Sequence, residues 1–352
     1  MNDKQPTYKF LTAADAGQWE AALARVKGKI DVFFELGLNS LFVKGDEELE
    51  AFCYDTGEKL FFLPYLKKPI LGTGYFDAET PYGYSGPVAS SNNSDFLNRA
   101  WEAWRQASVE AGIVALFLRF NPILRNHELV PTDFIKISRE CFVVVMDLTD
   151  KNEERVFAAF KKNNRNKIRS AEKNGVTIER STSQDALMVF HNMYEATMKR
   201  VGAESFYLFD QSFFRSLGQQ LKGKFMVLTA MHEGEAVAST IVLHNESILS
   251  VFLSSTAKKN ANGAANFLRF DSIRYAMELG LKHINFGGGR TNAADDSLLS
   301  YKRSFSDEMT DYFIGKAIFN EEVYNELCNK WEATASLDAI EKYGNRLLKY
   351  RY

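Results

Sequence analysis

A glycine-rich turn is the part of this chain best suited to bring backbone amides close to a substrate. It follows a short strand predicted over residues 283–286, and its residues are Gly287, Gly288, Gly289 and Arg290. Glycine lacks a Cβ, so a ligand can approach the amides of such a turn. Asp295 and Asp296 come next, and either could contact an incoming amine or cap the turn that follows. The alternative is an ordinary turn before a half-buried strand whose charges face water.

A lysine just beyond this turn is well placed to act on the same substrate. Lys302 and Arg303 lie between two aromatic residues, Tyr301 and Phe305. A cation held there can stabilise the oxyanion of a tetrahedral intermediate or a donor phosphate, rather than abstract a proton. We therefore expect Lys302 to be the catalytic residue and Tyr301 and Phe305 to contact substrate. The alternative is a surface lysine on a strand, and no side chain stands out as a general base.

Lysine and arginine are concentrated in residues 161–169, on about two turns of a predicted helix. Arg165 and Arg169 are four residues apart, so their guanidinium groups are expected on one side of that helix. A guanidinium can donate two parallel hydrogen bonds to a phosphate, which suits a nucleotide-linked acceptor or the acceptor stem of a tRNA. The alternative is a solvated basic helix face, the usual explanation for a run of charges.

Three segments together resemble the Fem family of peptidoglycan-bridge aminoacyltransferases and, equally, its relatives among bacterial acetyltransferase-like proteins. The segments are residues 81–87 (PYGYSGP), residues 164–176 (NRNKIRSAEKNGV) and the glycine-rich turn with its lysine. The resemblance extends over most of the chain, residues 33–313. It implies an α/β (α+β) protein of two tandem domains with the GNAT acyltransferase fold, each built on a mixed sheet. No heptad run appears, so the coiled-coil arm of the family is expected to be absent, as it is from some members.

The resemblance also assigns roles to residues outside the glycine-rich turn. It places Lys302 in the substrate channel, at the acyl-donor end, and makes Tyr82 and Tyr84 part of the substrate wall of the first domain. Rigid packing of a tight turn would explain the two tyrosines equally well. Arg200 is the cation left for the acceptor's phosphates, because residues 204–207 lack the arginine that the family usually supplies there. This departure separates the chain from the usual pattern for a uridine-diphosphate muropeptide acceptor.

The start of a helix predicted over residues 263–280 is the candidate donor-binding loop. In acyl-CoA-dependent enzymes of this type, a Gln/Arg-x-x-Gly-x-Gly/Ala loop holds the pyrophosphate at the helix N-terminus. This chain keeps only a remnant of that pattern, Asn262, Gly263 and Ala264, preceded by residues 258–261 (KKNA). The degenerate loop argues against coenzyme A, and it is what the resemblance to enzymes that use aminoacyl-tRNA implies. A simple helix-start turn is the alternative.

Hydrophobic patterning predicts helices and strands in the order of an α/β chain. The predicted helices cover residues 14–26, 96–111, 153–174, 184–200, 210–221, 263–280 and 321–349. The predicted strands cover residues 41–43, 60–66, 114–120, 141–148, 176–178, 225–231, 236–244, 248–254 and 283–286. The first half repeats the element order of the second in reduced form. We expect domains over residues 1–140 and 141–330, with a C-terminal helical tail, residues 331–352, that returns to the first domain.

The composition is that of a globular protein with enough apolar residues for two cores. Of 352 residues, 45% are hydrophobic and 25% are charged, and the net charge of −2 creates no global field for nucleic acid or anionic lipid. Any RNA contact would therefore use a local patch. Three widely spaced cysteines and five scattered histidines form no pattern typical of a disulfide framework or a metal site. With no apolar signal core and no run of ~18 apolar residues, the chain is expected to be cytoplasmic.

These features favour an enzyme that forms an amide between an activated acyl donor and an amine on a nucleotide- or lipid-linked cell-envelope precursor, as in peptidoglycan synthesis. Aminoacyl-tRNA, through its acceptor end, is the favoured donor, and no tightly bound cofactor or metal is expected. One alternative is an acyl-CoA-dependent N-acyltransferase acting on an amino sugar of a surface polysaccharide. The other is a non-catalytic module that binds an envelope precursor.

Overall fold

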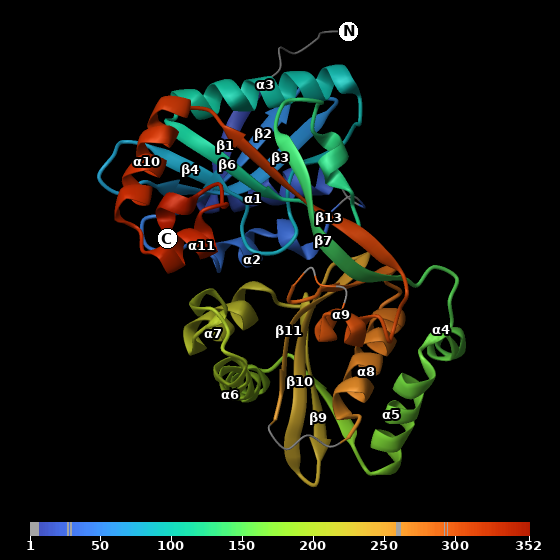
Figure 1. Ribbon diagram of the computed structural model, residues 1–352. Helices are drawn as coiled ribbons and strands as arrows, with labels where there is room; N and C mark the ends of the chain where they lie inside the picture. Colours follow the sequence, from blue (N-terminus) through green and yellow to red (C-terminus); the bar gives the residue numbers. More distant parts are fainter. Residues whose placement is uncertain (1–6, 27, 29, 258–261, 292, 294) are drawn as a thin grey trace. The chain divides into compact units, whose positions relative to one another are not determined.

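The computed structural model describes residues 7–26, 28, 30–257, 262–291, 293 and 295–352. The chain divides into two compact units, which we call unit 1 (residues 1–140 and 312–352) and unit 2 (residues 141–311). The chain enters unit 2 along β7 (Lys136–Asp147) and leaves it along β13 (Met309–Ile318) (Figure 1). The division after residue 140 coincides with the boundary expected from the sequence. The return to unit 1 comes at Tyr312, so unit 2 is shorter than the expected span to residue 330.

Unit 1 is built on a mixed sheet in the order β1-β2-β3-β4-β6-β13, with β5 paired to β3. Its strands are the end of β13 together with β1 (Thr7–Thr12), β2 (Glu48–Asp55), β3 (Leu60–Pro69), β4 (Phe76–Glu79), β5 (Val88–Ala89) and β6 (Ile113–Arg119). Neighbours run antiparallel except β4 and β6, which are parallel. The helix α3 (Ser94–Glu110) lies in the crossover between them, because parallel strands need a long connection.

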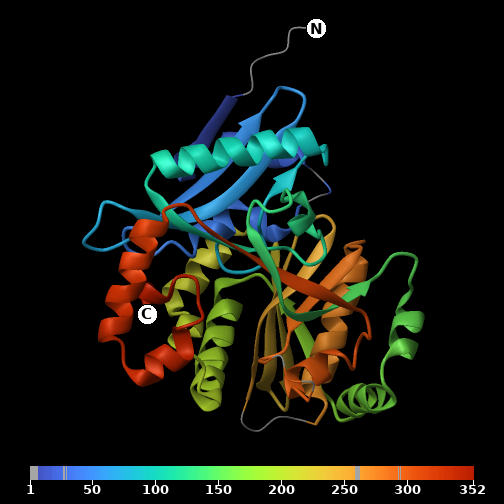
Figure 2. The same ribbon diagram turned by 45° about the horizontal axis from the view of Figure 1, so that its top comes forward.

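Helices cover both faces of the unit 1 sheet. Adjacent residues of β3 point to opposite faces, and each packs against a different helix. Phe61 packs against Trp101 of α3, with ring centroids 5.3 Å apart. Phe62 packs against Trp19 of α1 (Ala16–Arg25) at 5.1 Å. The C-terminal helices α10 (Glu321–Thr334) and α11 (Leu337–Tyr343) belong to this unit, and α10 contacts β6 (Figure 2).

Unit 2 has a second mixed sheet, in the order β7-β12-β11-β10-β9-β8. Its strands are the end of β7 together with β8 (Thr177–Ser181), β9 (Phe225–His232), β10 (Glu235–His244), β11 (Ile248–Thr256) and β12 (His283–Gly288). Of these neighbours only β11 and β12 are parallel, and α8 (Ala264–Glu278) connects them. α8 packs on β9 and β10 and against α5 (Lys162–Lys173), whereas α6 (Gln184–Val201) and α7 (Gln211–Gln220) lie over the other face (Figure 1).

The two units share one order of elements, as the sequence predicts. In unit 1, the antiparallel strands β2, β3 and β4 lead through α3 to the parallel strand β6. In unit 2, β9, β10 and β11 lead through α8 to the parallel strand β12. The prediction of an α/β protein with mixed parallel and antiparallel strands is therefore confirmed. In the described part of the chain, no helix has the length and apolar character needed to cross a bilayer.

The predicted basic helix over residues 153–174 is wrong in one respect, because the structure has two helices there. The first, α4 (Glu153–Ala159), ends at Phe160, whose backbone is extended at φ −62° and ψ 150°. α5 begins at Lys162. The Phe160 ring is buried in the core of unit 2 and fixes the break, and a pattern of surface charges carries no trace of this contact.

Other predicted elements also differ from the structure. Residues 41–43 do not form a strand, because Leu41 directly follows α2 (Leu36–Ser40). The predicted helix over residues 321–349 is divided into α10 and α11, since Ala335 is extended and the Ser336 side chain caps α11. The segment with Lys302 forms a helix, α9 (Ser297–Lys302), and not a strand. β1 and β2 lie outside the predicted strands.

Candidate active site

The parallel strands β11 and β12 diverge after three pairs of residues, and unit 2 can admit a substrate at this divergence. The pairs are Ile248–His283, Leu249–Ile284 and Ser250–Asn285. Beyond them β11 stays paired with β10 and β12 stays paired with β7, with a bulge in β12 between Asn285 and Gly287, whose φ is +76°. The facing edges of β11 and β12 therefore no longer pair with each other, which leaves backbone N–H and C=O groups for a ligand.

Two buried side chains at the last pair also have unused hydrogen-bonding capacity. Ser250 is 2% exposed and Asn285 is 1% exposed. Neither Ser250 Oγ nor Asn285 Nδ2 has a hydrogen-bond partner among the described residues. Buried polar groups are nearly always satisfied, so their position at the divergence is consistent with a site that a substrate or water completes.

The equivalent point in unit 1 is closed by the side chains of that unit. β4 and β6 form four pairs, and Thr80 N prolongs the pairing by donating to Phe117 O at 3.0 Å. The Arg119 guanidinium donates to the Glu79 carboxylate at 2.6 Å and to the Thr80 carbonyl oxygen at 2.7 Å. Lys68 also pairs with Glu79, at 3.0 Å, and with Glu47, at 3.2 Å. These charges neutralise one another, so of the two equivalent points the one in unit 2 is the candidate site.

Asp296 connects the glycine-rich turn to the helix that carries Lys302. Its Oδ1 accepts from Leu299 N at 2.7 Å as the N-cap of α9, and its Oδ2 accepts from Arg290 N at 3.0 Å. The Leu299 amide and the other donors hold the pKa of Asp296 below its usual value. A Cβ on Gly289 would lie 2.7 Å from Asp296 Oδ1, so a larger residue there would displace the Asp296 carboxylate. The sequence left two roles open for Asp296, contact with an incoming amine or a cap, and the structure shows the cap.

Lys302 lies at the end of α9, with its amine directed at the last residue of β12. Its Nζ donates to Gly288 O at 2.7 Å. Burial and, to a lesser degree, the positive charge of Arg269 lower the pKa of Lys302 to about 7, and Asp296 acts in the opposite direction. Near neutral pH a large share of Lys302 is therefore an uncharged amine, which can accept a proton. Lys302 is thus a candidate general base, a role for which no side chain stands out in the sequence.

Arg269 is the functional candidate that sequence reasoning missed. It lies on α8 and is 7% exposed, and its Nη2 donates to Ser254 Oγ of β11 at 3.1 Å. Its guanidinium carbon is 5.9 Å from the centroid of the Phe286 ring of β12. Arg269 therefore reaches both strands at their divergence. The signal that could have revealed it is a single charge inside the apolar run Phe267-Leu268-Arg269-Phe270.

The two aromatic residues beside Lys302 mainly hold α9 in place. Tyr301 Oη donates to the carbonyl oxygen of Ala265, in the first turn of α8, at 2.8 Å. Phe305 is 1% exposed and packs against Phe160, with ring centroids 5.3 Å apart. The expectation that Phe305 contacts substrate is corrected here, because its ring belongs to the core of unit 2.

The candidate donor residues at the start of α8 are largely occupied by packing. A Cβ on Gly263 would lie 2.1 Å from the carbonyl oxygen of Lys167 on α5, and Ala264 is fully buried. Gly263, with a φ of +87°, therefore allows two helices to meet, and neither residue has surface to offer a pyrophosphate. This corrects the donor-binding role expected for Gly263 and Ala264. Asn262 is exposed, and residues 258–261 lie outside the described residues.

Arg165 and Arg169 do not form the expected phosphate clamp. The Nη1 of Arg165 donates to Ala158 O at 2.9 Å and also to Phe160 O, so this guanidinium caps the C-terminal end of α4. Arg169 is exposed and lies over the Phe157 ring, 5.2 Å from its centroid. It shares a pocket of about 220 Å³ with Glu153, Glu154 and Glu172. These carboxylates disfavour a phosphate beside Arg169.

The remaining predicted residues also have structural partners. Arg200, near the end of α6, donates to the carbonyl oxygen of Thr256 at 2.9 Å and so attaches α6 to the end of β11. Tyr84, in unit 1, packs edge-on against Phe33, with ring centroids 5.6 Å apart, and Tyr82 packs at 5.5 Å from Phe42. Their expected roles toward a substrate stay predictions. Arg290 has an exposed side chain beside the turn of Gly287, Gly288 and Gly289.

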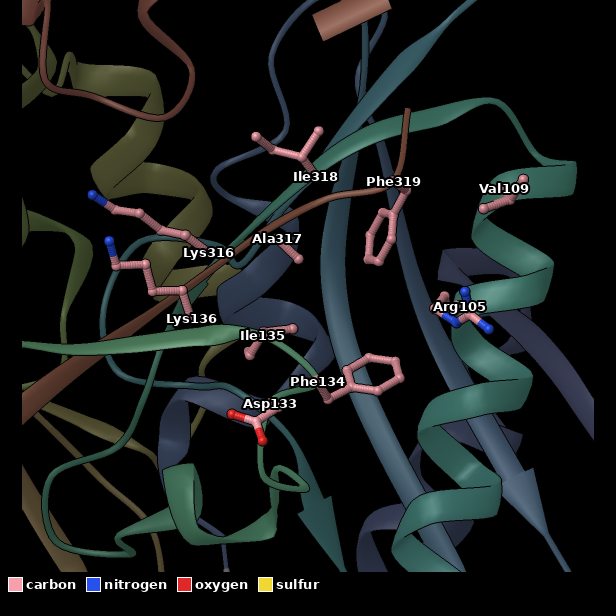
Figure 3. Close-up of a pocket in the computed structure, with 10 residues that line it drawn as sticks. All are labelled: Arg105, Val109, Asp133, Phe134, Ile135, Lys136, Lys316, Ala317, Ile318 and Phe319. Atoms are coloured by element: carbon pink, nitrogen blue, oxygen red, sulfur yellow. The ribbon is translucent and has the colours of Figure 1, made fainter. Parts of the chain in front are cut away.

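A surface pocket of about 300 Å³ lies in unit 1, between α3, residues 133–136 and β13 (Figure 3). The rings of Phe134 and Phe319 face its centre, while the ammonium ends of Lys136 and Lys316 point away from these rings. Arg105 is already paired with Glu102, at 3.0 Å through its Nε. The pocket brings together no residue of the β11–β12 divergence, and we do not assign it to the reaction.

Comparison with known proteins identifies the domain at this point. Residues 158–303 match the family described as acetyltransferase (GNAT) domain. Most of unit 2 is therefore similar to a GNAT acetyltransferase domain. The match runs from α4 to just after Lys302, so it contains β11, α8, β12 and α9. The chain is therefore an acyltransferase. No curated protein sequence matches it.

Solved structures with the same fold cover almost the whole chain. The crystal structure of FemX aligns with a TM-score of 0.72 at 14% identity, over 91% of this chain and 99% of that one. L-PGS from Bacillus licheniformis aligns with a TM-score of 0.57 at 17% identity, over 95% and 97%. A tandem GNAT protein from the clavulanic acid biosynthesis pathway, solved without AcCoA, gives 0.52 at 11% identity, over 90% and 99%. Their likeness confirms the predicted fold of two tandem GNAT-like domains.

Proposed function

We propose that this chain transfers an aminoacyl group from aminoacyl-tRNA to an amine on a cell-envelope precursor, forming an amide. The observation that carries the proposal is the position of Lys302. Its amine is held on the Gly288 carbonyl beside the divergence of β11 and β12, where it titrates near neutral pH. Acyl transfer to an amine needs a proton acceptor within reach of the attacking nitrogen, and Lys302 is the residue of this site that supplies one.

The reaction uses Lys302 twice. The acceptor amine attacks the acyl carbonyl and forms the C–N bond, and the neutral Lys302 amine takes the proton that the nitrogen loses. The ester C–O bond to the donor ribose then breaks, and protonated Lys302 returns the proton to the departing oxygen. Backbone N–H groups on the edges of β11 and β12 beyond their last pair can donate to the carbonyl oxygen as negative charge develops. The remaining rate enhancement comes from holding donor and acceptor together.

The choice of donor rests on the start of α8. In acyl-CoA enzymes of this type this helix N-terminus holds a pyrophosphate, but here Gly263 and Ala264 are packed against α5. The resemblance of the sequence to enzymes that use aminoacyl-tRNA also favours a donor other than acyl-CoA. The alternative donor is acyl-CoA, and the match to an acetyltransferase domain is the observation in its favour. The acceptor is proposed as a nucleotide- or lipid-linked precursor.

A label-transfer assay with two donors tests this proposal. One donor is a tRNA pool charged with labelled amino acids, the other is labelled acetyl-CoA, and each is offered with extracted envelope precursors. We expect transfer from tRNA only, sensitive to ribonuclease and lost in Lys302→Ala. Transfer from acetyl-CoA alone would move the chain to the alternative donor. Precursor binding without transfer from either donor would instead favour a non-catalytic module.

A further inference from the structure

Arg269 is a buried cation whose hydrogen-bonding capacity the protein leaves largely unused. Its Nη2 donates to the neutral hydroxyl of Ser254, and the hydroxyl of Tyr301, also neutral, interacts with the guanidinium. Its Nε and Nη1 are buried and have no hydrogen-bond partner among the described residues. A guanidinium cannot lose its proton at any pH that a folded protein tolerates, so burial without a counter-charge is costly. The geometry therefore calls for a ligand that supplies the missing acceptors.

Other arginines on or against α8 show that the chain normally provides such partners. Arg180 pairs with Asp271 at 2.7 Å and with Glu278 at 2.5 Å. Arg274 pairs with Glu153 at 2.7 Å. For Arg269, no ion pair to a carboxylate is found in the described part of the chain. Of these three arginines, Arg269 is the one that lacks a counter-charge, and it is the one that faces the divergence of β11 and β12.

The surroundings of Arg269 are electropositive. Lys302 is close enough for the charge of Arg269 to lower its pKa. The nearby carboxylate, Asp296, is already engaged by the amides of Leu299, Arg290 and Thr291. Tyr301, the other polar neighbour, keeps its proton and donates it to a backbone carbonyl. An anion brought between Arg269 and Lys302 would therefore meet one permanent cation, one amine that is charged in part, and no free acid.

The position of Arg269 indicates which part of a substrate would supply this anion. Its guanidinium lies between Ser254 on β11 and Phe286 on β12, on the α8 side of the strands. Lys302 marks the end of β12, where the acyl carbonyl would react. A group that extends from the reacting carbonyl into the divergence would reach Arg269. In an acyl donor, that group is the side chain of the transferred acyl unit.

We propose that Arg269 binds a carboxylate on the transferred acyl group, so that the chain selects acidic acyl donors. The inference rests on the proposed function, which it deepens by naming the class of acyl group. A carboxylate is small and planar and fits a guanidinium that is 7% exposed. A donor phosphodiester carries two further substituents, which so enclosed a position does not accommodate.

Matched donors test the selection directly. tRNA charged with labelled aspartate or glutamate is compared with tRNA charged with asparagine or glutamine, which have the same shape without the charge. We expect wild type to prefer the acid of each pair by at least about tenfold in kcat/KM. Arg269→Gln should reduce this preference to within about twofold while Arg269→Lys keeps part of it. Arg274→Gln, on the same helix but already paired, is the control and should keep the wild-type preference.

Two results would overturn the inference. One is equal use of acid and amide by wild type. The other is an equal loss with every donor in Arg269→Gln, which would mean that Arg269 stabilises the oxyanion or the fold. Unfolding temperatures of each variant show whether the fold is intact.

A second arm separates this inference from the proposed function. Thermal unfolding is followed with succinate or glutarate and with their diamides, at matched ionic strength. We expect the dianions to raise Tm of wild type and Arg274→Gln, and not of Arg269→Gln. If no charged tRNA serves as donor, the proposed function fails while this arm still decides the Arg269 site. Equal effects of acid and diamide there would overturn it.

Discussion

Lys302 and Arg269 are neighbouring basic side chains. Burial lowers the pKa of both, but only Lys302 loses its proton near neutral pH. Burial and the charge of Arg269 bring the pKa of Lys302 to about 7. Burial also lowers the pKa of Arg269, but a guanidinium starts so high that it stays charged. The site thus combines a permanent charge with a titratable amine. Acyl transfer to an amine can use both, the first for binding and the second for moving a proton.

The pH dependence of transfer should follow Lys302. We expect kcat/KM to rise with pH and to level off above about pH 7, because only the neutral amine accepts a proton. In Arg269→Gln the neighbouring charge is removed, so the pKa of Lys302 rises and the rise in kcat/KM moves to higher pH. The measurement is a pair of pH profiles with the same donor and acceptor.

The comparison between the two enzymes provides the control for these profiles. The acceptor amine titrates in the same way with wild type and with Arg269→Gln. A difference in pH between the two profiles therefore reports a change in the pKa of a group on the enzyme. A profile that falls above pH 7, or one that stays in place in Arg269→Gln, would show that Lys302 does not act as the base.

Asp296 should contribute to stability as a cap whose effect depends on pH. Asp296→Ala removes the N-cap of α9 and the acceptor for Arg290 N, and we expect a loss of about 1–2 kcal/mol in the free energy of unfolding. Because the pKa of Asp296 is lowered in the fold, its charge stabilises above the usual carboxyl range, and this is lost as pH falls through the lowered pKa. Urea unfolding at pH 7 and at about pH 3 measures both effects. A cost that is the same at both pH values would contradict the role of the charge.

At the scale of elements, the close contact between α5 and α8 depends on Gly263. Gly263→Ala places a Cβ 2.1 Å from Lys167 O at a φ of +87°, and we expect a loss of at least about 2 kcal/mol. Gly175→Ala is a matched control, because Gly175 has a φ of +80° with open space around its Cβ position. It should cost about 1 kcal/mol through the backbone alone. Equal losses in chemical unfolding would mean that the helix contact does not constrain Gly263.

Substitutions of Arg165 and Arg169 on α5 test whether these residues contribute to stability or to substrate binding. Arg165→Gln removes the side-chain cap of α4 and should lower the free energy of unfolding by about 1 kcal/mol, with KM little changed. Arg169→Gln is the comparison, since its guanidinium is exposed and should matter little to either quantity. Chemical unfolding and steady-state kinetics on both variants measure these effects. A rise of KM of about tenfold in both variants, without loss of stability, would restore the phosphate clamp.

Elements with a strong apolar pattern were predictable, and elements fixed by distant contacts were not. The predicted strand over residues 248–254 and helix over residues 263–280 lie within two residues of β11 and α8 at each end. The break at Phe160 is invisible in the sequence, because it depends on burial against α8 and Phe305. α9 was missed for a similar reason, since its start depends on the Asp296 cap rather than on apolar periodicity.

At the scale of the whole molecule, one order of elements is used twice with different results. In unit 1 the parallel pair β4–β6 is closed by Arg119 and Glu79. In unit 2 the pair β11–β12 diverges after Asn285, beside a cation that has no carboxylate partner among the described residues. The sequence and its resemblance indicated the repeated order of elements and singled out Lys302 as a candidate. Arg269 could not, because its importance lies in a missing partner, and a sequence does not show which charges are paired.

The bond formed in the product tests the central claim most directly. Labelled acyl donor, envelope precursors and enzyme are incubated together, and the labelled product is then treated with mild alkali, which cleaves esters and leaves amides intact. We predict label that survives alkali with wild type and is absent with Lys302→Met, a variant that keeps the length of the side chain without its amine. Label released by alkali, or an alkali-stable product formed equally well by Lys302→Met, would contradict an amide-forming site built on Lys302.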